Sequence, residues 1–273
     1  MTRSIEEQLE ILVEIAVGAG AVILPFYSGQ KDMGAMIKDD CSPVTLADQQ
    51  AEEFILEALA VAFPGVPVVA EEKCAAGDVP DLDAEGDGAF FLVDPLDGTK
   101  EFINGRDEFT VNIGLIRDGV PVMGVIYAPA LRDVYVGGIE SGAYCMHSLE
   151  DPDDFSLSAA ERIEMRPAGD FLTAVASRSH MNDETRTYME KRGISDFISA
   201  GSSLKFCLVA AGRADVYPRF GRTMEWDTAA GDAILRAAGG MTVRTDGSPF
   251  VYGKRNQADD SDFANPFFIA GKR

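Results

Sequence analysis

Apolar residues recur with a helical period in the first quarter of the chain. Residues 48–63, DQQAEEFILEALAVAF, carry apolar side chains at positions 54, 55, 58, 59 and 62. This spacing predicts an amphipathic helix that ends at Pro64-Gly65. The apolar stretch from Ile15 to Phe26 predicts another helix, and Ser4 and Glu7 form a capping box at its start.

In the middle of the chain, the pattern of apolar and polar residues becomes typical of strands. FTVNIGLI and VPVMGVIYA lie on either side of Arg117-Asp118-Gly119, a pattern typical of a hairpin. Residues 109–146 therefore predict an antiparallel meander. Upstream of it, residues 66–70 and 89–93 predict short buried strands, and the second of these runs directly into the sequence DPLDGT.

The remainder of the chain alternates strand-like and helix-like segments. Helices are predicted over 182–192, over 202–212 and within WDTAAGDAILRAAGG, and strands at LTAVAS, DVYPRF, MTVRT and FFIA. Such alternation is typical of α/β layers. The polar segment 147–166 separates the two patterns, so we expect an N-terminal α+β half over 1–150 and a C-terminal α/β half over 151–273.

Composition narrows the class of protein. A net charge of −21 repels nucleic acid and anionic lipid, so we expect no nucleic acid as a partner. The four cysteines contain no C-x-x-C pair, which predicts no zinc site or disulfide framework and fits a reducing cytosol. The N-terminal apolar stretch is shorter than the roughly 20 residues of a membrane span, and acidic residues precede it. We therefore expect no transmembrane segment and no signal peptide.

Candidate chemistry gathers where a predicted strand ends in two aspartates. Pro95 biases Asp94 toward an extended conformation, and a turn would bring Asp97 back to the same side. Two carboxylates placed together can share hard cations. Gly98 permits close approach of the backbone, and a helix that began at Thr99 would direct its free N–H groups at an anion. An acidic turn without function would have the same local sequence.

Two other acidic positions become candidate site residues only when they are considered together with this motif. Glu71 and Glu72 also follow a short apolar strand, and Asp227 begins the helical run WDTAAG. Taken singly, Asp227 is typical of a helix cap and Glu71 of a solvated loop. A site needs all of these carboxylates in one place.

Together and in this order, the motifs resemble the inositol monophosphatase superfamily of magnesium-dependent, lithium-sensitive phosphatases. Longer segments are similar to its bacterial 3′(2′),5′-bisphosphate nucleotidases: SPVTLAD (42–48), DPLDGTKEFINGRDEFTVNIGLI (94–116), SRSH (177–180), GSSLKFCLVAAGRADVYPRFG (201–221) and TMEWDTAAGDAIL (223–235). The chain departs from the pattern at Ala70 and in its long acidic loops, 75–88 and 147–165. The resemblance implies a sugar-phosphatase fold with layers α-β-α-β-α.

The resemblance also implies a metal site. Its cofactor would be Mg²⁺, two or three ions per site, and the matching ligands are Glu71, Asp94, the Leu96 backbone carbonyl, Asp97 and Asp227. The implied catalytic residues are Asp48, Thr99 and Glu71. Asp48 and Thr99 would orient and deprotonate a water that the metal activates for attack on phosphorus. From local sequence alone, Asp48 is equally a capping partner of Thr45.

The implied reaction is hydrolysis of adenosine 3′,5′-bisphosphate to AMP and phosphate, in support of sulfate assimilation. The candidates for substrate contact are Glu71, Leu96, Asp97, Gly98, Thr99, His180, Lys205, Arg219 and Asp227. Arg222 is an alternative to Arg219, because either guanidinium suits a second phosphate. Inositol monophosphate and fructose 1,6-bisphosphate are alternative substrates on the same fold. A non-catalytic, metal-binding acidic protein is the alternative of another class.

The remaining expectations concern the surroundings of the site. We expect Trp226 to pack beside Asp227 rather than to bind a base. The protein is expected to be cytoplasmic, with a peripheral place at the inner face of the membrane as the variant that the resemblance allows. A monomer and a homodimer are both compatible with the sequence.

Overall fold

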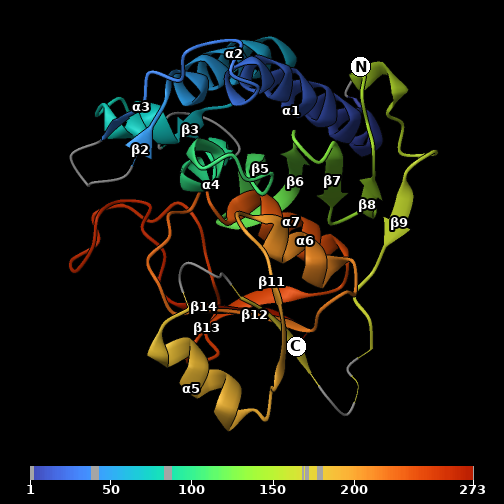
Figure 1. The fold of residues 1–273 in the computed structure, drawn as a ribbon, viewed down its shortest axis with the longest axis vertical. Coiled ribbons are helices and arrows are strands. Elements are labelled where there is room, and N and C mark those ends of the chain that lie inside the picture. Colours follow the sequence, from blue (N-terminus) through green and yellow to red (C-terminus); the bar gives the residue numbers. More distant parts are fainter. Residues whose placement is uncertain are drawn as a thin grey trace.

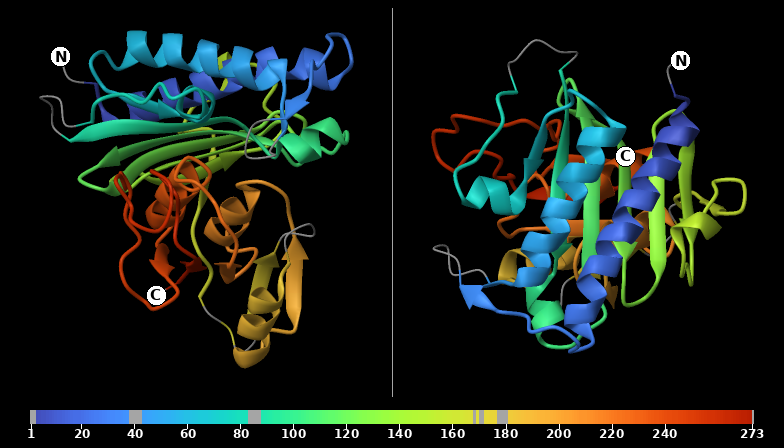
Figure 2. Two further views of the ribbon diagram at one scale, coloured as in Figure 1. Left: turned by 90° about the vertical axis from the view of Figure 1, so that its left-hand side faces the viewer. Right: turned by 90° about the horizontal axis from the view of Figure 1, so that it is seen from above.

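The protein folds into five stacked layers of helices and sheets. The computed structural model describes residues 3–37, 43–82, 88–167, 169, 172–176 and 181–272. Figure 1 and Figure 2 show helices at the top, a large sheet below them, a middle layer of helices, a smaller sheet and a last helix. The predicted α-β-α-β-α architecture is therefore confirmed.

The larger sheet has seven strands in the order β3-β4-β5-β6-β7-β8-β9. Only β3 and β4 run parallel, and the other neighbours are antiparallel. The strands are β3 (Val68–Ala70), β4 (Ala89–Asp97), β5 (Thr110–Arg117), β6 (Val120–Ala128), β7 (Asp133–Gly138), β8 (Gly142–Met146) and β9 (Glu161–Ile163). The predicted hairpin forms at Asp118 and Gly119, both with positive φ. The predicted meander over 109–146 is confirmed.

Two long helices cover the outer face of this sheet. They are α1 (Ile5–Tyr27), which packs on β5, β6 and β7, and α2 (Leu46–Ala62), which packs on α1 and β4. Ser4 and Glu7 form the predicted capping box. The helix is longer than the apolar stretch from Ile15 to Phe26, and by length and composition alone α1 could cross a membrane. Its apolar side chains nevertheless lie in the core between α2 and the sheet.

The smaller sheet belongs to the C-terminal half and has the order β11-β10-β12-β14-β13. Its strands are β10 (Thr173–Ala176), β11 (Asp196–Ser199), β12 (Val216–Arg219), β13 (Met241–Arg244) and β14 (Phe268–Gly271). Helices α6 (Leu204–Ala210) and α7 (Ala229–Ala237) lie between the two sheets, and α5 (Asp183–Lys191) packs against β12 from outside. The short elements are β1 (Met36–Ile37), β2 (Pro43–Val44), α3 (Glu71–Ala75), α4 (Thr99–Ile103) and the 3₁₀ turn η1 (Pro152–Asp154).

A row of glycines lets α7 approach the larger sheet closely. Gly114, Gly124 and Gly137 are cross-strand neighbours on β5, β6 and β7. A Cβ atom at Gly124 would lie 2.5 Å from the Ala230 carbonyl oxygen, and one at Gly114 would lie 2.8 Å from the Ala230 nitrogen. The helix backbone therefore occupies the space that side chains would fill. Because α7 follows Asp227 in the chain, this row also fixes the depth of that carboxylate.

Several boundaries differ from the sequence predictions. The larger sheet includes β9, so its last strand lies beyond the division predicted at residue 150. Strand β4 runs on through Asp97 rather than ending at Val93. Strand β11 and helix α3 were not predicted, because each is short and mostly polar or half-exposed. The division into two halves at residue 150 stays a prediction.

Candidate active site

An irregular stretch of β4 places the two central aspartates. Asp94 pairs with Asn112 and Asp97 pairs with Thr110, and the register shifts between them. The backbone N–H of Leu96 donates to Asp94 Oδ1 at 3.0 Å. The chain thus turns within the sheet rather than in a free loop, because an irregularity of this kind bends a strand and re-aims its side chains.

Glycine is required directly after Asp97. Gly98 has φ +90°, and a Cβ atom there would lie 3.1 Å from the Glu108 carbonyl oxygen. A residue with a side chain would meet both the strained left-handed backbone and this contact. Helix α4 begins at the next residue, Thr99, a start that the sequence analysis considered only as a condition.

Asp48 serves a helix cap and a site threonine at the same time. Its Oδ2 accepts from the Thr45 backbone N–H at 2.8 Å and from the Thr45 hydroxyl at 2.6 Å. Its Oδ1 lies 3.2 Å from Thr99 Oγ1, which is also 3.2 Å from the Leu96 carbonyl oxygen. The predicted cap with Thr45 is therefore confirmed, and Asp48 lies beside Thr99, while its catalytic role stays a prediction. Burial raises the pKa of Asp48 to about 6, against the lowering effect of the bonds from Thr45.

The other carboxylates of the site lie near one another in a poorly solvated place. Asp94 is 1% exposed. Burial raises its pKa well above the usual range, and the charges of Glu71, Asp97 and Asp227 add to this. Burial likewise raises the pKa of Asp227 to about 8, followed by repulsion from Asp97 and Glu71. Each carboxylate would thus be stabilised in its charged form by a cation placed among them.

The donor set fits a hard divalent cation. It consists of the four carboxylates and the Leu96 carbonyl oxygen, and oxygen ligands of this kind suit Mg²⁺ rather than zinc. The side chains do not converge fully: in the part of the chain that the structure describes, no three acidic, His or Cys side chains lie close enough to hold one ion. Joint coordination of a metal by these residues stays a prediction.

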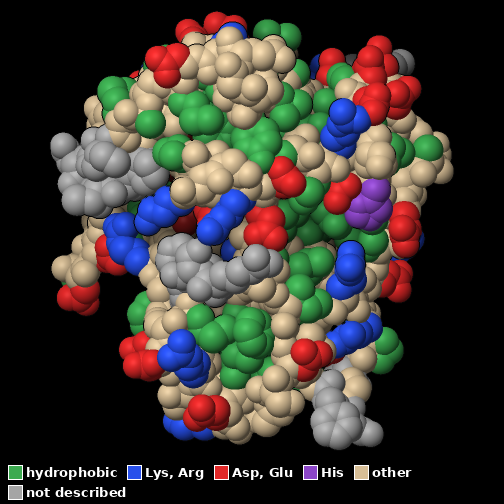
Figure 3. All heavy atoms as spheres, in the orientation of Figure 1, with side chains coloured by type: hydrophobic (Ala, Val, Ile, Leu, Met, Phe, Trp, Pro, Cys, Tyr) green, Lys and Arg blue, Asp and Glu red, His purple; other side chains and the backbone are tan. Residues whose placement is uncertain are grey.

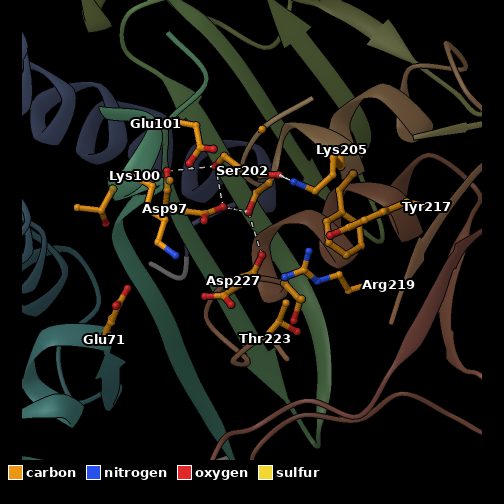
Figure 4. Close-up of a pocket in the computed structure, with 16 residues that line it drawn as sticks. Glu71, Asp97, Lys100, Glu101, Ser202, Lys205, Tyr217, Arg219, Thr223 and Asp227 are labelled. Carbon is orange, nitrogen blue, oxygen red and sulfur yellow. Dashed lines mark hydrogen bonds between the residues drawn. The ribbon is translucent and has the colours of Figure 1, made fainter. Parts of the chain in front are cut away.

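A cavity of about 280 Å³ opens beside these carboxylates. The predicted site residues that line it are Glu71, Asp97, Gly98, Thr99, Lys205, Arg219 and Asp227. Figure 4 shows Glu71 on one side of the cavity and Lys205, Tyr217 and Arg219 on the other, with Asp97 and Asp227 between them. The cavity therefore has a mainly acidic end, which Lys100 also lines, and a basic end.

The basic end comes from α6 and β12. Lys205 is buried, donates to the Ser202 carbonyl oxygen and lies 5.5 Å from the centre of the Tyr217 ring. Burial lowers the pKa of Lys205 to about 8, and the charge of Asp97 opposes this shift. Arg219 donates to the Arg222 carbonyl oxygen at 3.3 Å, while its buried Nε has no hydrogen-bond partner among the residues that the structure describes. An anion would supply the acceptor that this nitrogen lacks.

Two serines that the sequence analysis did not single out hold Asp97. The hydroxyls of Ser202 and Ser203 donate to Asp97 Oδ2 at 2.6 and 2.9 Å. Ser203 also lies 2.9 Å from the Asp227 carbonyl oxygen and accepts from Asn112 Nδ2 at 3.0 Å. A carboxylate of the first half is thus fixed by the second half. Both serines lie in the segment GSSLKF, and no periodicity of the sequence marks them as site residues.

Further support for Asp227 comes from Glu225, which the sequence analysis also missed. This fully buried carboxylate accepts from the backbone N–H groups of Gly253 and Lys254 at 2.6 and 2.9 Å, and pairs with Lys254 Nζ at 2.5 Å. Asp227 Oδ2 accepts from the Met224 backbone N–H at 2.8 Å. The chain on both sides of Asp227 is therefore anchored, which limits where its carboxylate can point.

The remaining predicted residues lie elsewhere. His180 falls outside the described residues. Arg222 does not line the cavity; its Nη2 donates to Ser261 Oγ at 2.7 Å and lies 3.3 Å from Asp260 Oδ1. Trp226 is buried with its ring centre 6.2 Å from that of Phe263, as expected of a packing residue.

The molecular surface has a place where basic side chains gather, although the net charge of the whole chain is negative. On the face drawn in Figure 3, Lys and Arg side chains gather at mid-height on the left, between the two halves. This grouping is notable in a chain with a net charge of −21.

Comparison with known proteins agrees with the fold and the motifs. The model of the inositol monophosphatase family matches residues 4–265. The chain is 43% identical over 260 residues to the 3′(2′),5′-bisphosphate nucleotidase CysQ of Salmonella typhimurium, covering 95% of this chain and 98% of that protein. It is 41% identical to CysQ of Escherichia coli, with the same coverage.

A solved structure shows the same architecture. The crystal structure of CysQ from Bacteroides thetaiotaomicron superimposes with a TM-score of 0.80, at 39% sequence identity, and covers 98% of both chains. An agreement of this extent includes both halves and the middle layer of helices on which the cavity depends.

Proposed function

Because the chain belongs to the inositol monophosphatase family, we propose that it is a magnesium-dependent 3′(2′),5′-bisphosphate nucleotidase. The reaction is hydrolysis of adenosine 3′,5′-bisphosphate to AMP and phosphate. One observation carries this proposal: the cavity places a carboxylate end and the Asp48–Thr99 pair opposite two cations, Lys205 and Arg219. A substrate with two separated phosphates matches such a two-ended cavity.

The acidic end would hold the metal. The family is generally metal-dependent, and Glu71, Asp94, Asp97, Asp227 and the Leu96 carbonyl oxygen are the donors that we assign to two or three Mg²⁺ ions. When bound, such ions lower the pKa of water and stabilise the entering and leaving oxygens. They also cancel the four negative charges that would otherwise repel a phosphate.

Thr99 and Asp48 form a route for the proton of the attacking water. Thr99 Oγ1 would accept a hydrogen bond from this water and would donate its own proton to Asp48 Oδ1, which lies 3.2 Å away. The other oxygen of Asp48 is fixed by Thr45, so the accepting oxygen has one orientation. The water oxygen would bond to phosphorus as the P–O bond to the ribose 3′ oxygen breaks. One proton of the water would pass to this pair, and the leaving ribose oxygen would take up a proton from solvent to become a hydroxyl. Glu71 would orient the same water from across the cavity.

The basic end would bind the second phosphate and so set specificity. Lys205 and Arg219 are the cations of this end, and within the described part of the chain the buried Nε of Arg219 has no acceptor. The N–H groups at Gly98 and Thr99 would bind the phosphate that is cleaved. His180, in the segment SRSH, is a third candidate for the distal phosphate.

An inositol monophosphatase activity is the second candidate, because that activity occurs on the same fold. A structure titled as an inositol monophosphatase from Anabaena matches with a TM-score of 0.71 at 25% identity. Inositol monophosphate carries one phosphate, however, and would leave Lys205 and Arg219 without a partner anion. Fructose 1,6-bisphosphate has two phosphates but no base to fill the remaining space.

The decisive experiment compares substrates and two neighbouring arginines. We expect kcat/KM for adenosine 3′,5′-bisphosphate to exceed that for inositol 1-phosphate clearly. Arg219→Gln should raise KM for the bisphosphate about tenfold or more, since a charge-assisted hydrogen bond contributes about 1.5–3 kcal/mol. Arg222→Gln is the matched control and should change KM little. A preference for inositol 1-phosphate, or equal effects of both arginines, would contradict the assignment.

The wider setting follows from the substrate. Removal of adenosine 3′,5′-bisphosphate would support sulfate assimilation, and the phosphosulfate nucleotide PAPS would be converted to APS by the same cleavage. We place this activity in the cytoplasm, with or without peripheral contact to the inner membrane. A protein that binds Mg²⁺ tightly but cleaves neither nucleotide would instead be a non-catalytic metal-binding protein.

A further inference from the structure

A second, larger cavity opens on the C-terminal half, away from the catalytic one. Its volume is about 670 Å³, within the range of about 300–1,000 Å³ of small-molecule sites. Its walls come from the segment before β10, the start of β12, strands β13 and β14, and the C-terminal end of α5. Among the described residues, it shares no lining residue with the catalytic cavity. The proposed reaction therefore makes no use of it.

Basic side chains predominate around this cavity. Of the residues that the structure describes, four cations line it, Arg166, Arg192, Arg244 and Lys272, against the two carboxylates of Asp215 and Asp246. The local balance is thus two positive charges in excess. The whole chain has 24 Lys and Arg against 45 Asp and Glu, so the sign of the charge is reversed here. Such a reversal favours an anionic occupant.

Three of these cations are available to a ligand. Arg166 is engaged, because its Nε donates to Asp215 Oδ1 at 2.8 Å. Arg192 lies over the Tyr188 ring, with its guanidinium carbon 5.5 Å from the ring centre. Within the described residues, Arg192, Arg244 and Lys272 have no carboxylate within ion-pair distance. These three side chains are exposed at the mouth of the cavity.

The floor of the cavity is apolar. It is formed by Leu172, Val216, Val243 and Ile269, with the ring of Tyr188 at one side. Val216 and Ile269 belong to the face of the sheet on which α5 packs, and they join Tyr188 in one apolar cluster. Apolar atoms below and cations at the rim match a molecule that is apolar at one end and anionic at the other.

We propose that this cavity is a binding site for an amphipathic organic anion, with an aromatic or aliphatic body on the sheet and a phosphate, sulfonate or carboxylate held by Arg244 and Lys272. Tyr188 and Arg192 would flank a flat body, since a guanidinium and an aromatic ring both stack on planar groups. The site is independent of the nucleotidase assignment, because it rests on other residues.

The test uses an aromatic sulfonate, 1-anilinonaphthalene-8-sulfonate, with the full-length protein. We expect saturable binding of one molecule per chain by fluorescence and calorimetry, with NMR shift changes at Tyr188 and Ile269. The double variant Arg244→Gln/Lys272→Gln should weaken this binding at least about tenfold, because two charged donors are lost. Phosphate release from adenosine 3′,5′-bisphosphate should stay unchanged in this variant.

A matched pair of arginines supplies the control. Arg162→Gln/Arg186→Gln removes two exposed cations of surface ion pairs outside the cavity and should leave binding unchanged. Competition of the bound sulfonate by AMP or by octanoate then identifies the phosphate or the carboxylate as the preferred group. Equal affinity of the two double variants, absence of saturable binding, or displacement by neither competitor would overturn the proposal.

Discussion

At the scale of single residues, Asp48 unites stability and chemistry in one side chain. Oδ2 belongs to the cap of α2, and Oδ1 faces Thr99 in the site. Three substitutions separate these roles. Thr99→Ala should lower kcat by about 10² to 10⁴, the range of a lost proton-transfer step, with little change in stability. Phosphate release and urea unfolding measure the two quantities in the same preparation.

The two companion variants complete the comparison. Asp48→Asn keeps an oxygen for the cap but cannot accept the proton, so kcat should fall as far as in Thr99→Ala. Thr45→Ala removes the capping hydroxyl and should cost about 1 kcal/mol of unfolding free energy, while most activity remains. Full activity of Asp48→Asn would show that Asp48 is only a capping residue.

The sequence could predict single residues where a motif fixes their spacing. Asp97, Gly98, Thr99 and Asp227 line the cavity as expected. Ser202 and Ser203 were missed as partners of Asp97, because their contact joins segments far apart in the chain. The choice between Arg219 and Arg222 likewise depends on which side chain points inward, and sequence spacing does not give this direction.

At the scale of elements, the packing of α7 against the glycine row decides where Asp227 lies. Gly124→Ala would place a methyl group only 2.5 Å from the Ala230 carbonyl oxygen. We expect a loss of about 1–3 kcal/mol from overpacking, and a fall in phosphate release as α7 shifts. Chemical unfolding and a kinetic assay on the same variant measure both effects.

Gly138→Ala is the control for this prediction. Gly138 lies on β7 beside Gly137, and its added Cβ atom would meet α1 at an ordinary distance of 3.4 Å. The stability and activity of this variant should be closer to those of the wild type than the stability and activity of Gly124→Ala. If Gly124→Ala is as stable and as active as Gly138→Ala, the close approach of α7 is not what holds Asp227.

Element prediction was reliable where apolar periodicity is long and failed where elements are short. Helices α1 and α2 and the meander β5–β8 follow from the pattern, because each buries one regular face. Strand β9 lies in a segment interpreted as a polar boundary, and only its pairing with β8 makes it a strand. The extension of β4 to Asp97 was hidden by Pro95, which signals a turn but is tolerated at an irregular pairing.

At the scale of the whole molecule, ion pairs join distant segments and make stability depend on pH. Arg166 lies in the segment that links the two sheets, and it binds Asp215 at the start of β12. The bond from Arg166 lowers the pKa of Asp215, and the Thr173 backbone N–H adds to this. The folded state therefore holds this carboxylate ionised at a lower pH than the unfolded chain does.

The sign of the pH effect follows from this lowered pKa. The stabilisation is fully present above the unfolded value of about 4 and is lost as the pH falls through the folded value. The difference in unfolding free energy between the wild type and Asp215→Asn should thus be constant at neutral pH and shrink below about pH 4. Urea unfolding of both proteins from pH 7 to pH 3 measures it. A difference independent of pH would contradict the role of this pair.

The site itself is a property of the whole molecule, because Asp97 of the first half is held by Ser202 and Ser203 of the second. The central claim is that this shared site hydrolyses a nucleoside bisphosphate with the help of bound Mg²⁺. The most direct test is phosphate release from adenosine 3′,5′-bisphosphate with Mg²⁺, after EDTA, after Mg²⁺ is restored, and with Li⁺. We predict release with Mg²⁺, none after EDTA, recovery on restoration and a fall with Li⁺. Release that persists in EDTA, or none in Mg²⁺ from folded protein, would contradict the account.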